Sequence, residues 1–84
     1  MKQIHELLDE YIKRANVAHY VGSGAEEKAL YRIVMALTTP DPVQQLLLSK
    51  QQAELDIREK PDLAAKYNRK IKWYDQAIAE LLGE

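Results

Sequence analysis

Hydrophobic residues recur along most of the chain at spacings of three and four, which is the period of an amphipathic α-helix. Three short segments interrupt this pattern: Gly22-Ser23-Gly24, the run from Thr38 to Pro42, and Lys60-Pro61-Asp62. Each of these segments is rich in residues that end or begin helices. The pattern therefore predicts an all-α fold, a compact bundle of four helices in a single domain that spans residues 1–84.

The first predicted helix runs from about Lys2 to His19. A glycine just beyond it, Gly22 or Gly24, supplies the positive φ that ends such a helix. Its hydrophobic residues share one face, which we expect to be buried: Ile4, Leu7, Leu8, Tyr11, Ile12, Ala15 and Ala18.

The second predicted helix begins at a capping box. In this box, the side chains of Ser23 and Glu26 each bond to the backbone amide of the other residue. The helix is hydrophobic almost all round, so we expect neighbours on every side and the most central position in the bundle. One wide arc holds Ala29, Leu30, Ile33, Val34 and Leu37, and the opposite side holds Tyr31 and Met35.

The third predicted helix starts at Asp41 as N-cap with Pro42 in its first position, and it ends near Glu59. The fourth begins at Pro61 or Asp62 and ends at Gly83. A short connection between them predicts an antiparallel hairpin, although Pro61 also allows one long, kinked helix. The inward faces are Val43, Leu46, Leu47, Ala53 and Ile57 on the third helix, and Leu63, Tyr67, Ile71, Tyr74, Ile78 and Leu81 on the fourth.

The composition limits the class of protein. A hydrophobic content of 46% and a net charge of −1 predict a folded chain rather than a disordered one. The chain has no cysteine and its charged N-terminus has no apolar signal-peptide core, so we expect a cytoplasmic protein. No uncharged stretch approaches the roughly 20 residues of a membrane span. A chain this short buries only about 60% of its unfolded surface, which favours binding to another protein or to a second copy of itself.

Candidate chemistry is sparse. His5 and Asp9 stand one helical turn apart, as two zinc ligands would, but no third ligand with the required spacing follows. The glycines around Ser23 precede Glu26 and Glu27, which would repel a bound phosphate, so a turn with a helix cap is the better interpretation. We therefore expect no enzyme activity, no catalytic or metal-binding residue and no cofactor.

The first unusual surface lies on the fourth predicted helix. Lys66, Arg69, Lys70 and Trp73 fall on one arc beside the hydrophobic stripe. The segment from Arg58 to Lys72 contains six basic and two acidic residues. Basic residues around an aromatic ring are typical of nucleic-acid binding, and they also suit an acidic protein surface. In the plainer interpretation, Trp73 reaches sideways into the core and the lysine stems lie along it.

The second unusual surface lies on the third predicted helix. Leu48 and Leu55 are seven residues apart, more than 100° away from the inward stripe by helical geometry. Gln44, Gln51, Gln52 and Glu59 flank them. A short hydrophobic seam with a polar rim resembles half of a helix pair, so we predict self-association as a homodimer. The alternative is that this helix is wedged between the first and fourth helices and buries both faces.

One further alternative is a helix-turn-helix formed by the second and third predicted helices. Gln44, Gln45, Ser49 and Lys50 would then read bases. The turn lacks the usual glycine and the recognition helix has few basic residues near its start, so we rank this alternative below the others. The leading hypothesis is a small protein–protein interaction module, a regulator, inhibitor or assembly adaptor. Nucleic-acid binding through the fourth helix is the main alternative.

Overall fold

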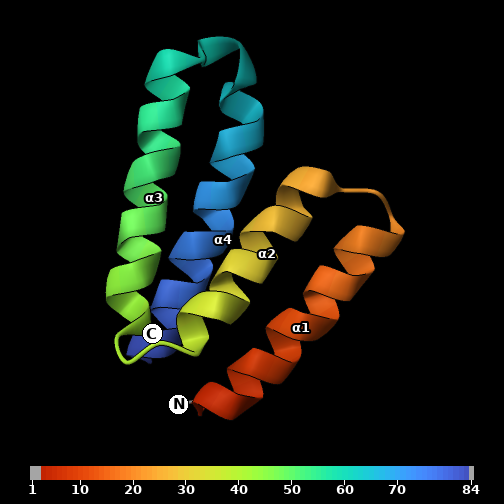
Figure 1. Ribbon diagram of the computed structural model, residues 1–84, viewed down its shortest axis with the longest axis vertical. Helices are drawn as coiled ribbons and strands as arrows, with labels where there is room; N and C mark the ends of the chain where they lie inside the picture. The colour runs from red at the N-terminus through yellow and green to blue at the C-terminus, as the bar shows by residue number, and fades with distance from the viewer. Residues whose placement is uncertain (1–2, 84) are drawn as a thin grey trace.

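The computed structural model describes residues 3–83 of the chain. Four α-helices and one short 3-10 turn account for most of this part, and it contains no strand. The predicted all-α fold is therefore confirmed (Figure 1). In chain order the elements are α1 (Ile4–Tyr20), α2 (Gly24–Leu37), α3 (Pro42–Glu59), the 3-10 turn η1 (Pro61–Leu63) and α4 (Ala64–Leu82).

The helix α2 lies at the centre of the bundle, as predicted. On one side it packs against α1, which runs antiparallel to it, and on the other side it packs against α4. Its contact with α3 is smaller (Figure 1). The helices α3 and α4 form an antiparallel hairpin joined by η1. Pro61 opens this turn as a separate element, so the alternative of one long, kinked helix is excluded.

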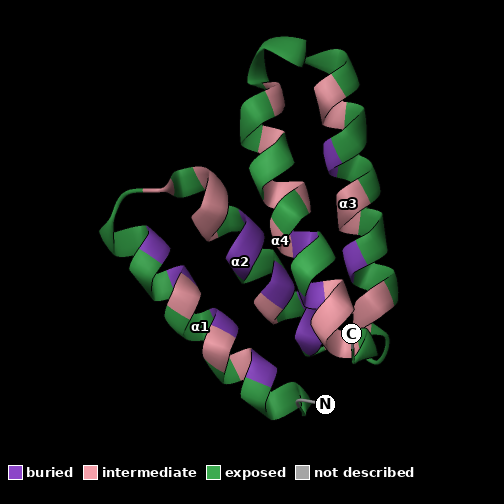
Figure 2. Ribbon diagram, turned by 180° about the vertical axis from the view of Figure 1, so that it is seen from behind, coloured by how far each residue is buried: buried purple, intermediate pink, exposed green. Residues whose placement is uncertain are grey.

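The core forms where α2 faces α1 and α4 (Figure 2). Alanines recur in these contacts, and the size of the side chains at a helix–helix contact sets how closely the helices approach. Ile33 of α2 is fully buried among them, which fits the central place of this helix. The buried residues are Leu7, Tyr11, Ala15 and Ala18 of α1, Ala29, Leu30, Ile33, Ala36 and Leu37 of α2, Leu46 and Ala53 of α3, and Tyr74 and Ala77 of α4.

The turn between α1 and α2 differs in one detail from the prediction. Gly22 is the one of the two candidate glycines that ends α1, with a φ of +74°. The amide of Ser23 donates to the carbonyl of Ala18 at 2.9 Å, which is the bond of a Schellman turn. That amide is therefore not available to Glu26, and the Ser23 side chain makes no cap hydrogen bond. The predicted capping box is wrong, because the turn uses the same amide to end the preceding helix.

The N-terminus of α3 agrees with its prediction. Asp41 Oδ1 accepts a hydrogen bond from the amide of Gln44 at 3.2 Å, and Pro42 occupies the first turn. The helix ends at Glu59, as expected. At the far end of the hairpin, Gly83 closes α4 with a φ of +79°.

The α2 surface that carries Tyr31 and Met35 was expected to be covered, and it is open. Both side chains are exposed, Met35 to 70%, because no helix packs on that side of α2. Some stripe residues of the other helices are exposed as well, since they stand at the ends or edges of their stripes: Ile4, Ile12, Leu47 and Leu63. The core is therefore narrower than the hydrophobic pattern suggests.

The far end of the α3–α4 hairpin extends past the pair formed by α1 and α2 (Figure 1). Ala53 of α3 and Tyr74 of α4 are buried, but none of the twenty residues between them is. Ile71 and Trp73 pack against the edge of the core, and most of the others contact one another across the hairpin and leave their remaining surface open (Figure 2).

Candidate functional site

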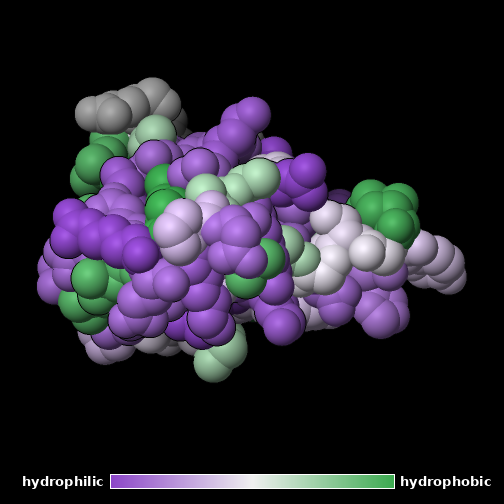
Figure 3. Space-filling model, turned by 90° about the horizontal axis from the view of Figure 1, so that it is seen from above, coloured by the Kyte–Doolittle hydropathy of each residue, from purple (hydrophilic) through white to green (hydrophobic). Residues whose placement is uncertain are grey.

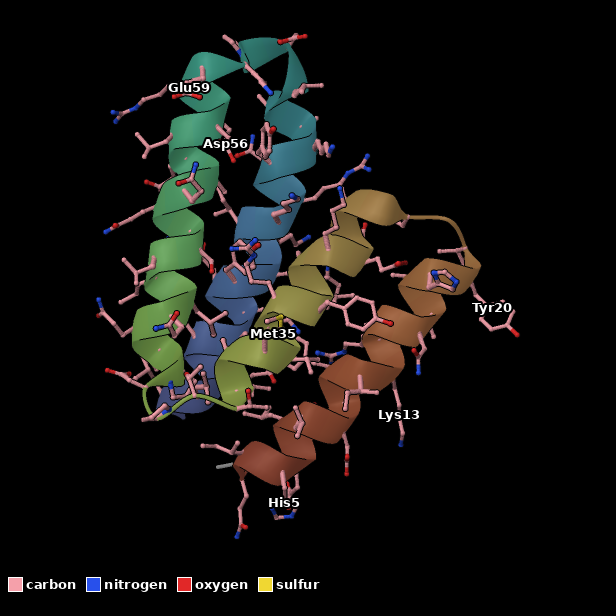
Figure 4. All side chains as sticks on the ribbon, viewed as in Figure 1. His5, Lys13, Tyr20, Met35, Asp56 and Glu59 are labelled. Atoms are coloured by element: carbon pink, nitrogen blue, oxygen red, sulfur yellow. The ribbon has the colours of Figure 1, made fainter. Side chains whose placement is uncertain are left out.

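A groove of about 640 Å³ opens on the exposed side of α2. The helix α2 forms one wall, α3 and α4 form the other, and the loop after α2 closes one end. Figure 4 shows Met35 on this side of α2, with α3 and α4 beside it. Among the residues that line the groove are Tyr31, Arg32, Met35, Ser49, Lys70 and Tyr74.

Three cations line this groove, Lys28 and Arg32 of α2 and Lys70 of α4, and Lys66 stands beside Lys70 one turn earlier on α4. We call these four residues the basic cluster. Within each helix the two cations are one turn apart, so they project from the same face. Burial lowers the pKa of Lys70, and the neighbouring charges of Lys66, Lys28 and Arg32 lower it further. Lys28 and Arg32 of α2 therefore act on Lys70 across the groove.

The carboxylates nearby are engaged elsewhere. Glu27 Oε2 lies 2.9 Å from Nδ1 of His19, and Asp75 Oδ1 lies 2.7 Å from Nζ of Lys50. Asp56 accepts a hydrogen bond from the side-chain amide of Gln52 at 3.1 Å. The negative charge of Asp56 also partly offsets the lowering of the Lys70 pKa. Within residues 3–83, no carboxylate forms an ion pair with any member of the basic cluster.

Aromatic and hydrophobic side chains lie among these cations. The Lys70 ammonium is 5.5 Å from the centroid of the Tyr67 ring, a cation–π distance. Tyr74 is almost completely buried, and this burial raises the pKa of its hydroxyl, with a partial offset from Arg32. The groove can therefore hold carboxylates or phosphates through charge-assisted hydrogen bonds and contact apolar groups through Tyr31 and Met35.

The four residues expected to share one basic surface are divided between two sides of α4. Lys70 lines the groove beside α2, and Lys66 acts on it from one turn earlier on α4, so both belong to the basic cluster. Arg69 and Trp73 instead line a separate hollow with Glu26. Sequence reasoning did not select Lys28 and Arg32, although their spacing of four on the polar side of α2 was visible.

Trp73 is partly buried and packs against the core. Its ring meets that of Tyr11 at a near-perpendicular angle, and the Arg14 guanidinium lies 5.6 Å from its centroid. These contacts correspond to the plainer interpretation of Trp73, in which the ring reaches sideways toward the core.

The seam on α3 is open in the structure. Leu48 and Leu55 are 48% and 49% exposed, and the glutamines that flank them, Gln44, Gln51 and Gln52, are exposed too. The helix packs on α4 and more lightly on α2, so it is an edge helix (Figure 2). The alternative in which α3 is wedged between α1 and α4 is therefore wrong.

The remaining candidates have partners or lie apart. Ser49 donates to the carbonyl of Gln45 at 3.0 Å, and Lys50 reaches Asp75, so two of the side chains considered for base reading bond within the chain. His5 is exposed near the start of α1, at the outer edge of the molecule (Figure 4). In the described part of the chain, no three residues of metal-binding type gather around a common point.

Two further findings concern the whole chain. Across residues 3–83, none of the helices is both long enough and apolar enough to cross a membrane. In comparisons with known proteins, the chain matches no family model, no curated protein and no solved structure.

Proposed function

We propose that this chain is a protein–protein interaction module that holds an acidic segment of another protein in the groove beside α2. The observation that carries this proposal is the basic cluster, in which four cations from two helices lie close together, none of them in an ion pair with a carboxylate, and only Asp56 partly offsets their effect on Lys70. Such cations repel one another, and an acidic ligand would relieve that repulsion. The composition, free of cysteine, favours the cytoplasm as the place where this module works.

A protein segment suits the groove better than a nucleic acid does. Tyr31 and Met35 offer apolar surface for side chains, and methionine adapts to varied partners. Single-stranded nucleic acids are usually held by a longer basic track with aromatic rings free for stacking. Trp73 does not line this groove, because its ring lies on another side of α4, beside Tyr11 and Arg14. We therefore treat nucleic-acid binding as an outcome of the test.

The test compares two labelled probes by fluorescence anisotropy. One is a glutamate-rich peptide with leucines and a central proline, which keeps it extended. The other is a single-stranded DNA of similar charge. We expect saturable peptide binding that weakens at least about tenfold in the double variant Arg32→Gln/Lys70→Gln, because charge-assisted bonds are lost. The matched control, Arg58→Gln/Lys60→Gln, removes two exposed cations outside the groove and should bind normally.

Two results would contradict the proposal. If the DNA binds more tightly than the peptide, with a steep dependence on salt, the groove is a nucleic-acid site. If the Arg32/Lys70 variant and the control bind the peptide equally, the groove is not its binding site.

We also propose that two copies pair through the seam on α3. Leu48 and Leu55 are aligned on the outer face of an edge helix, and the glutamines between and beside them are uncharged. Two such seams can approach each other without placing like charges at their centre. A contact that one surface makes with itself has two-fold symmetry, so it closes as a dimer.

A further inference from the structure

A second groove lies between α1 and α4, lined by different residues from those beside α2. It has a volume of about 320 Å³, and most of its lining is apolar: Val17, Ala18, Val21, Leu30 and Trp73. An adjoining hollow of about 390 Å³ shares Trp73 and Glu26 with it and extends along α4 to Arg69, Lys72 and Gln76. We call the two together the Trp73 groove.

The groove exists because α1 and α4 diverge. They are joined near Tyr11, where Arg14 Nη1 lies 3.9 Å from Glu80 Oε1 and the guanidinium lies over the rings of Tyr11 and Trp73. Beyond that point α1 runs away from α4 toward the α1–α2 turn (Figure 1). Leu30 of α2 lies at the bottom of this wedge and is almost completely buried.

The apolar wall of the groove is accessible. Val17 and Val21 are 61% and 72% exposed, although both are hydrophobic. Figure 3 shows hydrophobic surface at the end of the molecule where α1 turns into α2. Exposed hydrophobic residues that adjoin a groove are typical of sites where another molecule binds.

The rim of the groove is positively charged. Lys13 stands on α1 and points outward (Figure 4), and Arg69 and Lys72 stand on α4 across from it. In the described residues these three cations have no carboxylate partner. Glu26 is the one acidic residue that lines the groove, and Glu80 is already paired with Arg14.

We propose that the Trp73 groove binds an amphipathic α-helix of a partner protein. The hydrophobic face of that helix lies on Val17, Val21 and Trp73, and acidic residues on its flanks face Lys13, Arg69 and Lys72. The apolar floor and the uncompensated cations on both rims select this occupant, because helices bound in grooves use an apolar face for affinity and charged flanks for orientation. This site is separate from the groove beside α2, so the chain offers two docking surfaces.

Trp73 reports on the proposal directly, because it is the single tryptophan of the chain. The probe is a synthetic peptide of leucine, alanine and glutamate, with leucine at the helical spacing, containing no tryptophan or tyrosine. As the peptide covers the ring, water leaves it, and the emission should move to shorter wavelength and saturate with peptide concentration. The peptide should gain helical circular dichroism over the same range.

Matched variants locate the binding. Val17→Glu places a carboxylate on the wall of the groove, against the hydrophobic face of the peptide and near its acidic flanks, and should weaken binding at least about tenfold. Asn16→Glu adds the same charge at the neighbouring exposed position outside the groove and should bind as the wild type does. The variant Arg32→Gln/Lys70→Gln should also keep the full Trp73 response, which separates this site from the proposed function.

Each alternative outcome overturns the proposal. Unchanged Trp73 emission at saturating peptide, or equal binding by Val17→Glu and Asn16→Glu, removes the groove as the site. Emission that shifts with protein concentration alone assigns the groove to a second copy of the chain. Loss of the response in the Arg32/Lys70 variant assigns the peptide to the groove beside α2.

Discussion

The rings of Tyr11 and Trp73 meet at an interplanar angle of 83°, with 6.4 Å between their centroids. The Arg14 guanidinium lies over both rings, 4.9 Å from the Tyr11 centroid, and its Nη1 atom approaches Glu80. The backbones of α1 and α4 make few contacts beside this cluster. The junction of the two helices therefore depends on four side chains, and its strength should depend on the protonation of Tyr11.

The first prediction concerns alkaline pH. Burial, and then the charge of Glu80, raises the pKa of Tyr11 to about 12 from its ordinary value of 10.0. The folded state thus holds this proton more tightly, so the stabilisation is complete below about pH 10 and is lost as the pH rises toward about 12. Two pKa units correspond to about 3 kcal/mol. Urea unfolding measured across this range should show a shallower decline for Tyr11→Phe than for the wild type.

Tyr20→Phe is the control for this experiment, because Tyr20 is almost fully exposed. It should leave the alkaline decline unchanged. A decline that is equally steep in Tyr11→Phe would show that Tyr11 does not control it.

The second prediction concerns the core. Ile33→Ala should lower the free energy of unfolding by about 2–5 kcal/mol, since it leaves a cavity in the middle of the bundle. Met35→Ala on the same helix should cost less than about 1 kcal/mol, because that side chain is mostly exposed. Chemical denaturation gives both values. Equal costs would mean that α2 is not the central helix.

The third prediction concerns repulsion within the basic cluster. Lys70→Gln removes the cation whose pKa its neighbours lower, so it should raise stability by a few tenths of a kcal/mol or more at low salt. The gain should shrink as salt screens the remaining charges. Lys60→Gln, at the end of the hairpin, should show no such gain. Thermal melts at two salt concentrations test the difference, and a destabilised Lys70→Gln at low salt would refute it.

The fourth prediction concerns self-association. Leu48→Glu should give a monomer that keeps its helical circular dichroism, because Leu48 is half exposed and two glutamates would be buried near the dimer axis. Leu63→Glu, outside the seam, should leave the dimer intact. Sedimentation equilibrium measures both. A wild-type mass of 9.7 kDa at high concentration would exclude the dimer.

The sequence was sufficient to predict the helices and most of their ends, but not the cap of α2. Gly22, Asp41 with Pro42, and Gly83 set helix boundaries through local backbone geometry, which requires no knowledge of the tertiary fold. The central place of α2 followed from its hydrophobic content, because such a helix needs neighbours on more than one side. The exposure of Leu48 and Leu55 followed from their angle to the inward stripe.

The candidate sites could not be predicted in the same way. Lys28 and Arg32 meet Lys66 and Lys70 only because α2 and α4 cross at this place, and the crossing depends on how the side chains of the two helices interlock. The residues of the predicted α4 surface do share one arc of the helix. However, α2 packs against the middle of that arc, so Lys70 and Arg69 line different hollows. The exposure of one side of α2 could not be predicted for a related reason. Hydrophobic residues in a sequence do not show how many helices will cover them.

The end of the α3–α4 hairpin beyond Ala53 and Tyr74 contains no buried residue. Its backbone amides should exchange with solvent through local opening, at a much lower free energy than those of α2. Lys66 lies in this end of the hairpin. The α4 side of the basic cluster therefore moves with a segment that opens locally, whereas the α2 side is fixed at the centre of the protein.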